Sequence, residues 1–312
     1  MAKRDLLSMD DLSRADVELV LDTAESFLPV LHREIKKVPT LRGRTIINLF
    51  YESSTRTLAS FELAGKRLSA DVMNIRARGS SVDKGESLKD TTLTLSAYSP
   101  DIIVVRHPQI GACKLVSACS AASVVNAGDG KHQHPTQCLL DLFTMRQALG
   151  RELDGRSVAI VGDILHSRVA RSDIQGFLMM GMEVTLVAPP TLLPHEVEAL
   201  GAKVSFDIAD IREADVVYLL RMQTERQDAG ANFIPSLREY AALYGVTPER
   251  LRAGQRVMHP GPINRGVEIS AAVADDPETL IEQQVESGLA VRMAILYRTI
   301  VGMDERDDEE GA

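Results

Sequence analysis

Short apolar runs alternate with longer helical patterns along the whole chain. The continuous runs at 45–51 and 101–106 predict strands covered on both faces, as in a parallel sheet. Between such runs, apolar residues recur at intervals of three and four. Over 13–37 this spacing follows Ser13 and Asp16, the signature of a capped helix start. The pattern therefore predicts an α/β protein built on parallel sheets.

This alternation occurs in two series. Further strands are expected at 71–75, 123–128, 157–163, 182–189, 203–206, 216–220 and 256–259, and further helices at 135–149, 167–180 and 194–200. Two such series predict two doubly wound parallel-sheet domains, with ligands bound in a cleft at the carboxyl ends of the strands.

A segment with a glycine at each end, GRELDG at 150–155, separates the two series. We therefore expect a first domain over 1–149, a second over 150–284, and a C-terminal part over 285–312. Most of a long helix from about residue 277 to 301 lies in that last part. The tail after it is acidic and poor in apolar residues, which is typical of disorder.

The stretch TIINLFYESSTRTL at 45–58 changes abruptly from apolar to hydroxyl-bearing residues. Ser54, Thr55, Arg56 and Thr57 fall on the first turn of the helix that follows the strand. Unpaired N–H groups and the positive dipole end make a helix start a site for an anion such as phosphate. An ordinary serine or threonine cap explains the hydroxyls equally well at this point.

Other candidate residues also lie at the end of a predicted strand or in the segment after it. They are Arg106, His134, Gln137, Arg168, Arg221, Gly261 and Pro262. Because ligands collect where parallel strands end, this shared position favours a function for residues that would individually be ordinary surface or structural side chains. The similar turn at 159–168, AIVGDILHSR, lacks the GxGxxG pattern of a dinucleotide site.

Composition narrows the class of protein. The 312 residues contain 45% hydrophobic and 25% charged residues, with a net charge of −9 that argues against a nucleic-acid partner. No apolar run is long enough for a membrane span, and the N-terminal stretch MAKRDLLSMDD lacks the apolar region of a signal peptide. Three cysteines, Cys113, Cys119 and Cys138, lack metal or disulfide spacing. We expect a cytoplasmic protein that gathers anionic substrates with local arginines.

The polar motifs together resemble the catalytic chains of the aspartate carbamoyltransferase family over residues 5 to 302. The matching motifs are the 45–58 stretch, RHP at 106–108, HQHPTQ at 132–137, Arg168, RMQTER at 221–226 and HPGP at 259–262. The resemblance implies carbamoyl transfer from carbamoyl phosphate to the α-amino group of L-aspartate, the committed step of pyrimidine (UMP) biosynthesis. It implies no metal, cofactor or covalent intermediate.

Site residues follow from the same resemblance. Carbamoyl phosphate is assigned to Ser54, Thr55, Arg56, Thr57, Ser80, Arg106, His134, Gln137, Gly261 and Pro262, and aspartate to Lys84, Arg168, Arg221 and Gln223. Of these, Arg56, Thr57, Arg106 and His134 are the expected catalytic residues. Loss of one oxyanion donor is expected to lower turnover roughly 10² to 10³-fold.

The resemblance also implies an assembly. The polar loop at 79–87 resembles the family's loop that reaches into a neighbouring subunit, so Ser80 and Lys84 would act in trans within a homotrimer whose active sites lie at subunit interfaces. Asp83 stands where some members carry a second basic residue. A regulatory chain or a dihydroorotase-like partner is a further expectation, which the sequence leaves open.

Two alternatives remain. An ornithine carbamoyltransferase usually carries cysteines where this chain has Thr136 and Gly261, and Arg221 would repel a cationic amine. A non-catalytic binding subunit is also possible on the fold alone. For the remaining polar residues we expect supporting roles: His107 and His132 orient neighbours, and Glu52 forms an ion pair with Arg56 or Arg106.

Overall fold

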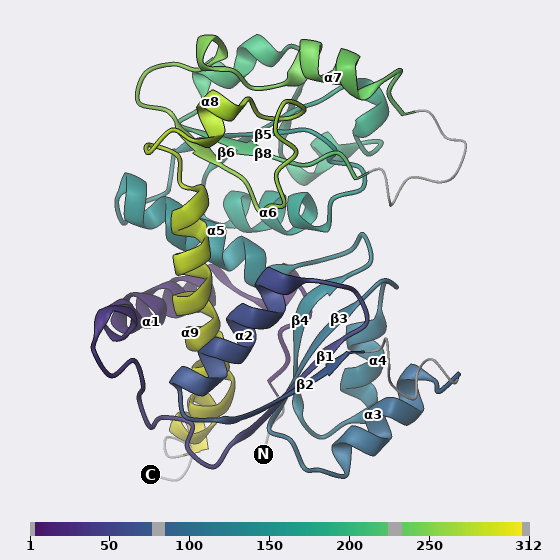
Figure 1. The fold of residues 1–312 in the computed structure, drawn as a ribbon, viewed down its shortest axis with the longest axis vertical. Coiled ribbons are helices and arrows are strands. Elements are labelled where there is room, and N and C mark those ends of the chain that lie inside the picture. The colour runs from purple at the N-terminus through teal and green to yellow at the C-terminus, as the bar shows by residue number, and fades with distance from the viewer. Residues whose placement is uncertain (1–3, 77–84, 224–232, 308–312) are drawn as a thin grey trace. The chain divides into compact units, whose positions relative to one another are not determined.

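The computed structural model describes residues 4–76, 85–223 and 233–307. Its chain divides into two compact units, drawn in Figure 1. Unit 1 comprises Met1–Phe143 and Val285–Ala312, and unit 2 comprises Thr144–Gln284. The change between units falls inside helix α5 (Pro135–Leu149), ahead of the glycine-flanked segment at 150–155.

Unit 1 is built on a four-stranded parallel sheet. Its strands lie in the order β2 (Asp71–Arg76), β1 (Thr45–Phe50), β3 (Ile102–His107) and β4 (Ser123–Asp129). Every residue of β4 is buried, as are all but the first residue of β1. Burial on both faces is the reason that the central strands β1 and β3 read as nearly continuous apolar runs.

Helices cover both faces of this sheet (Figure 1). Side chains of β1 and β3 such as Leu49 and Val105 pack against α3 (Leu88–Ser96) and α4 (Ala112–Cys119). Helix α2 (Thr55–Arg67) lies on the other face, close enough that a Cβ at Gly65 would stand 2.6 Å from Val72 Cγ2. Helix α9 (Ile281–Asp307) contacts α1 (Arg14–His32) through edge-to-face rings of Tyr297 and Phe27.

Unit 2 contains a five-stranded parallel sheet. The order is β7 (Lys203–Ser205), β6 (Glu183–Val187), β5 (Ser157–Val161), β8 (Val216–Leu219) and β9 (Arg256–Met258). One face packs against Ile211, Val246 and Ile269. On the other face Tyr218 meets Phe177 of helix α6 (Arg168–Met179). The two parallel sheets confirm the expected fold class.

Most predicted elements are confirmed, but the helix predicted at 194–200 is wrong. The structure has only a short 3-10 turn there, Val197–Leu200, because Glu196 adopts a left-handed conformation with φ 56° that interrupts an α-helix. The pattern also missed α7 (Leu237–Tyr244) and α8 (Ala271–Ala274). Helix α9 runs to Asp307, past its predicted end, and the final residues 308–312 lie outside the described chain.

None of the described helices is both long and apolar enough to cross a lipid bilayer.

Two serines that precede helices differ in whether their side chains cap the helix. The phosphate hypothesis needs the donors at the start of α2 to be open to a ligand. Ser13 accepts a hydrogen bond from Asp16 N and forms a full capping box at the start of α1. Ser54 holds the equivalent position before α2, but its side chain makes no capping hydrogen bond. The cap interpretation of Ser54 is therefore wrong, since its hydroxyl does not satisfy the helix end.

This difference predicts unequal effects on stability. Ser13→Ala should lower the free energy of unfolding by about 1 kcal/mol, because it removes a cap, whereas Ser54→Ala should change it by less than about 0.5 kcal/mol. Urea unfolding followed by circular dichroism would measure both variants against the unmodified chain. An equal loss in both would show that Ser54 is a structural cap after all.

Candidate active site

The first group of predicted site residues lies where β1 passes into α2. Thr55, Arg56 and Thr57 form the first turn of the helix, and Ser54 precedes it. Thr57 is buried, whereas Arg56 is exposed. Burial of part of its side chain lowers the pKa of Arg56 from the ordinary arginine value, without removing its charge at neutral pH. The turn thus presents hydroxyls, a cation and helix N–H groups together.

Arg106 is brought to this turn by strand pairing. It lies opposite Phe50 in the β1–β3 register, and its carbonyl accepts a hydrogen bond from Tyr51 N at 2.8 Å. Its Nε lies 3.3 Å from Glu52 Oε2, and its Nη1 donates to Ala127 O at 3.1 Å. The expected ion pair of Glu52 with one of the two arginines is confirmed for Arg106. These two contacts hold the guanidinium at the carboxyl end of β3.

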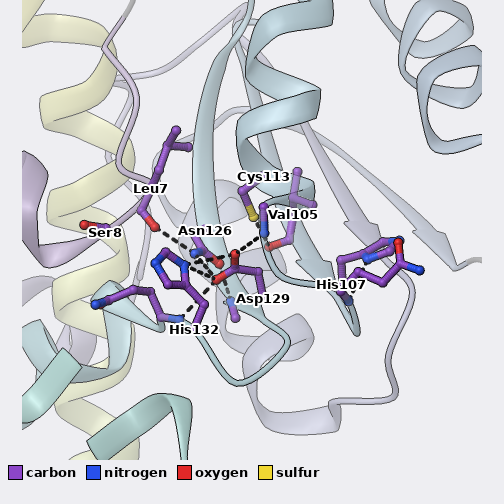
Figure 2. A network of polar contacts seen from close by, with 12 residues as sticks. Leu7, Ser8, Val105, His107, Cys113, Asn126, Asp129 and His132 are labelled. Atoms are coloured by element: carbon purple, nitrogen blue, oxygen red, sulfur yellow. Dashed lines mark hydrogen bonds and ion pairs between the residues drawn. The ribbon is translucent and has the colours of Figure 1, made fainter. Parts of the chain in front are cut away.

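A buried carboxylate organises the turn after β4 (Figure 2). Asp129 accepts hydrogen bonds from Asn126 Nδ2 at 2.8 Å, Gly111 N at 3.0 Å and Gln133 N at 3.1 Å. Its Oδ2 also lies 3.2 Å from His132 Nδ1. His132 therefore supports a neighbour, as expected. Together these contacts fix the turn that leads directly into the next predicted site residue, His134.

His107 supports a neighbouring turn in a similar way. Its Nδ1 accepts a hydrogen bond from Gln109 N at 3.0 Å, which places the proton of a neutral ring on Nε2. Burial lowers the pKa of His107 from the ordinary histidine value. The ring lies 4.6 Å from that of Tyr51. The expected orienting role of His107 is confirmed.

His134 and Gln137 lie at the start of α5. The carbonyl oxygen of His134 accepts a hydrogen bond from Gln137 N at 2.9 Å, and the ring Nδ1 of His134 lies 3.4 Å from Thr136 Oγ1. Both side chains are buried. Gln137 Nε2 donates to both oxygens of Asp141, at 3.1 and 3.2 Å. Pro135 occupies the first turn of the helix, where its missing N–H costs nothing.

In unit 2, a second buried carboxylate joins two loops. Asp163 follows β5 and accepts from the backbone N of His166 at 3.2 Å, with His166 Nδ1 at 2.7 Å. Its other oxygen accepts from Gln223 N, beyond β8, at 3.1 Å. Ahead of it, a Cβ at Gly162 would stand 2.5 Å from Leu220 O, so only glycine lets these two strand ends approach so closely. Asp163 thereby positions the backbone of a predicted aspartate-binding residue.

The two predicted arginines of unit 2 also follow these strands. Arg168 is the first residue of α6 and is buried, at 2% exposure. Arg221 is partly exposed, and its Nη1 donates to Met222 O at 3.2 Å. Ser167 caps α6 by accepting from Ala170 N at 3.1 Å. The placement of both arginines at strand ends is confirmed, and their roles stay predictions.

A third carboxylate holds the HPGP turn after β9. His259 Nδ1 accepts from Gly261 N at 2.8 Å, so the proton of a neutral ring lies on Nε2, which faces Glu268 Oε1 at 3.1 Å. The same carboxylate oxygen accepts from Asn264 N at 2.6 Å. The peptide bond between Gly261 and Pro262 is cis. The buried pair of His259 and Glu268 thus holds the backbone at Gly261 and at Asn264.

The structure places the predicted residues in two groups, one in each unit. Ser54, Thr55, Arg56, Thr57, Arg106, His134 and Gln137 belong to unit 1, and Arg168, Arg221, Gln223, Gly261 and Pro262 to unit 2. Ser80 and Lys84 lie outside the described residues.

The sequence analysis missed the supporting carboxylates Asp129, Asp141, Asp163 and Glu268. Two of them were visible as acidic residues that directly end a buried strand, since Asp129 closes β4 and Asp163 lies just beyond β5. Asp141 lies four residues after Gln137 in the predicted helix at 135–149, a spacing at which two side chains meet, whereas Glu268 required knowledge of side-chain contacts. Within the described ranges, no group of three or more histidine, cysteine, aspartate or glutamate side chains could hold a metal ion.

Comparison with known proteins covers both units. Residues 4–147 match the model of the aspartate/ornithine carbamoyltransferase carbamoyl-P binding domain, and residues 154–299 match the model of the Asp/Orn binding domain.

Similar proteins extend over nearly the whole chain. The aspartate carbamoyltransferase catalytic subunit of Pelotomaculum thermopropionicum is 55% identical over 298 residues, which are 94% of this chain and 96% of that one. The corresponding subunit of Corynebacterium efficiens is 55% identical over 309 residues, 96% of this chain and 98% of its own.

Two solved structures agree with these relatives. Aspartate transcarbamoylase from Trypanosoma cruzi, in complex with N-(phosphonacetyl)-L-aspartic acid, has a TM-score of 0.84 at 32% identity and covers 94% of this chain and 95% of its own. The catalytic subunit of M. jannaschii aspartate transcarbamoylase has a TM-score of 0.83 at 35% identity and covers 99% of each chain. The chain belongs to the aspartate/ornithine carbamoyltransferase family.

Proposed function

We propose that this chain catalyses transfer of the carbamoyl group of carbamoyl phosphate to the α-amino group of L-aspartate, in pyrimidine biosynthesis. The observation that carries the proposal is the start of α2, where Ser54 makes no cap and the β1–β3 register sets Arg106 beside the end of β1. The Trypanosoma cruzi relative has been solved in complex with carbamoyl phosphate and aspartate, which supports the choice of substrates.

Residues of unit 1 would bind and polarise carbamoyl phosphate. Ser54, Thr55, Arg56 and Thr57 offer donors to a phosphate at a helix N-terminus, where the dipole also favours negative charge. Thr57, Arg106 and His134 would donate to the carbonyl oxygen as it becomes an oxyanion. Gln137, with the backbone carbonyls of Gly261 and Pro262, would accept from the carbamoyl NH₂.

The aspartate would be held by cations and an amide. Arg168 would bind the α-carboxylate, while Arg221, Gln223 and Lys84 bind the side-chain carboxylate, because guanidinium groups grip carboxylates bidentately. The neutral amine then attacks the carbamoyl carbon and forms the new C–N bond. The C–O bond to phosphate breaks, and the departing phosphate accepts the proton of the amine. No protein nucleophile takes part.

The proposal includes a homotrimer in which Ser80 and Lys84 complete the site of a neighbouring chain. Exposed apolar side chains on adjacent elements of unit 1, Leu63 on α2 and Met73 on the edge strand β2, support an interface on this part of the unit. The free thiols of Cys113, Cys119 and Cys138 support a cytoplasmic location. A regulatory or dihydroorotase-like partner would add to this trimer.

The substrate assignment is tested with the purified chain alone. Given carbamoyl phosphate, it should release phosphate and form N-carbamoyl-L-aspartate with L-aspartate, and give no product with L-ornithine, since Arg221 repels a cationic side chain. Colorimetric phosphate and ureido assays run in parallel would measure this. Turnover with ornithine would contradict the role of Arg221, and silence with both amines would favour a non-catalytic binding subunit.

The catalytic role of Arg106 predicts a large loss of turnover. Arg106→Ala should lower kcat roughly 10² to 10³-fold, because one donor to the developing oxyanion is removed. The matched control is Arg14→Ala, which removes a partly exposed arginine that pairs with Glu18 on α1 and should leave kcat unchanged. Initial rates at saturating substrates would decide, and an unchanged kcat in Arg106→Ala would defeat the mechanism.

Shared sites predict complementation between inactive variants. Lys84→Gln and Arg106→Ala should each be nearly inactive alone. Random trimers formed from an equal mixture should recover about a quarter of the unmodified activity, because the closed trimer pairs an intact Lys84 with an intact Arg106 at one site in four. Each variant taken separately through the same dissociation and reassembly is the control. Absence of any recovery would place Lys84 in its own chain's site.

A further inference from the structure

Asp141 is a buried carboxylate that the reaction scheme above does not use. It lies one helical turn after Gln137 on α5 and has no solvent exposure. Both of its oxygens accept from Gln137 Nε2, at 3.1 and 3.2 Å. A fully buried carboxylate is costly unless it is paired, so a specific role has to offset its presence here.

A buried cation compensates the charge of Asp141. Burial lowers the pKa of Arg292, on α9, to about 10, while the negative charge of Asp141 opposes this shift. Arg292 therefore stays cationic at neutral pH. Its Nη1 donates to Ser60 Oγ at 2.8 Å, and its guanidinium lies 5.1 Å from the ring centre of Phe61. Both of these contacts belong to α2, so the cation is fixed in place.

An ionised carboxylate can only accept hydrogen bonds, which determines how the Gln137 amide is turned. Its NH₂ group has to face Asp141, and Oε1 has to face away. Within the described chain, no hydrogen bond joins this Oε1 to another residue. The amide is thereby held with an unused acceptor on its outer side.

We propose that Asp141 is a positioning residue, which locks the Gln137 amide so that Oε1 accepts from the NH₂ of the carbamoyl group and the site selects carbamoyl over acyl phosphates. This inference rests on the proposed function, in which Gln137 contacts the carbamoyl nitrogen. An acetyl group has a methyl in place of the NH₂ and cannot donate to Oε1. Discrimination between the two therefore reports on the orientation of the amide.

Binding of two stable phosphonates tests the proposal without turnover. Phosphonoacetamide carries the NH₂ group, and 2-oxopropylphosphonate carries a methyl in its place. Asp141→Asn keeps the shape but offers both a donor and an acceptor, so either face of the Gln137 amide can turn toward it. Calorimetry should show phosphonoacetamide binding roughly 3- to 10-fold more weakly to this variant, because Oε1 is no longer held toward the ligand and the hydrogen bond from its NH₂ is lost, with 2-oxopropylphosphonate unchanged.

A double-mutant cycle separates positioning from a general structural effect. In a Gln137→Met background, Asp141→Asn should cause no further change in either dissociation constant. An unchanged ratio of the two dissociation constants would overturn the proposal, whether both ligands bind equally more weakly or neither changes. A full effect of Asp141→Asn in the Gln137→Met background would also overturn it. If thermal melting shows that Asp141→Asn does not fold, Asp141→Leu with Arg292→Met removes the buried pair as a unit, and the same loss of discrimination is expected.

The unmodified chain distinguishes this inference from the proposed function. If it binds both phosphonates equally well, or binds neither, Asp141 does not set selectivity and the inference fails. If it prefers phosphonoacetamide but forms no carbamoyl aspartate, the proposed function fails and the inference stands on the binding cycle alone.

Discussion

Buried carboxylates hold the loops that leave the parallel strands at their carboxyl ends. A parallel sheet brings these ends to one edge, where the chain departs from the ladder and its N–H groups lose their sheet partners. Asp129, Asp163 and Glu268 each accept two or more hydrogen bonds from such groups or from an adjacent histidine. The predicted site residues on these loops depend on this support, because a loop with unsatisfied buried donors would not keep one conformation.

The same edge shows how an acidic chain can bind anionic substrates. The net charge of −9 repels a phosphate at long range, so binding depends on local groups. Arg106 is held by Glu52 and by Ala127 O, and its position is therefore set before a ligand arrives. A prearranged guanidinium loses little side-chain entropy on binding, which is the advantage of arginine over a flexible lysine at such a point.

Helix starts in this protein differ in whether a serine side chain caps them. Ser13 and Ser167 satisfy the starts of α1 and α6 with their own hydroxyls. Ser54 does not, and leaves the start of α2 to be satisfied from outside. A helix start without a cap is less stable in isolation, so its retention beside Arg106 is consistent with binding of an anion. Arg292 of α9 connects this helix to two others. It interacts electrostatically with Asp141 of α5 and donates a hydrogen bond to Ser60 of α2.

The sequence by itself determined the alternation of strands and helices, because period and burial leave a direct record in apolar residues. It also identified the residues that follow each strand, since parallel strands end at one edge. The contact of Gln137 with Asp141 follows from helix spacing, since the two residues lie four apart on α5, but the burial of Asp141 and the placement of Arg292 near it were decided only by tertiary structure. The contact of Glu268 with His259 was likewise decided only by tertiary structure, because it depends on the path of a turn, which has no period. The helix predicted at 194–200 failed for the related reason that one left-handed residue, Glu196, is a local choice that spacing does not encode.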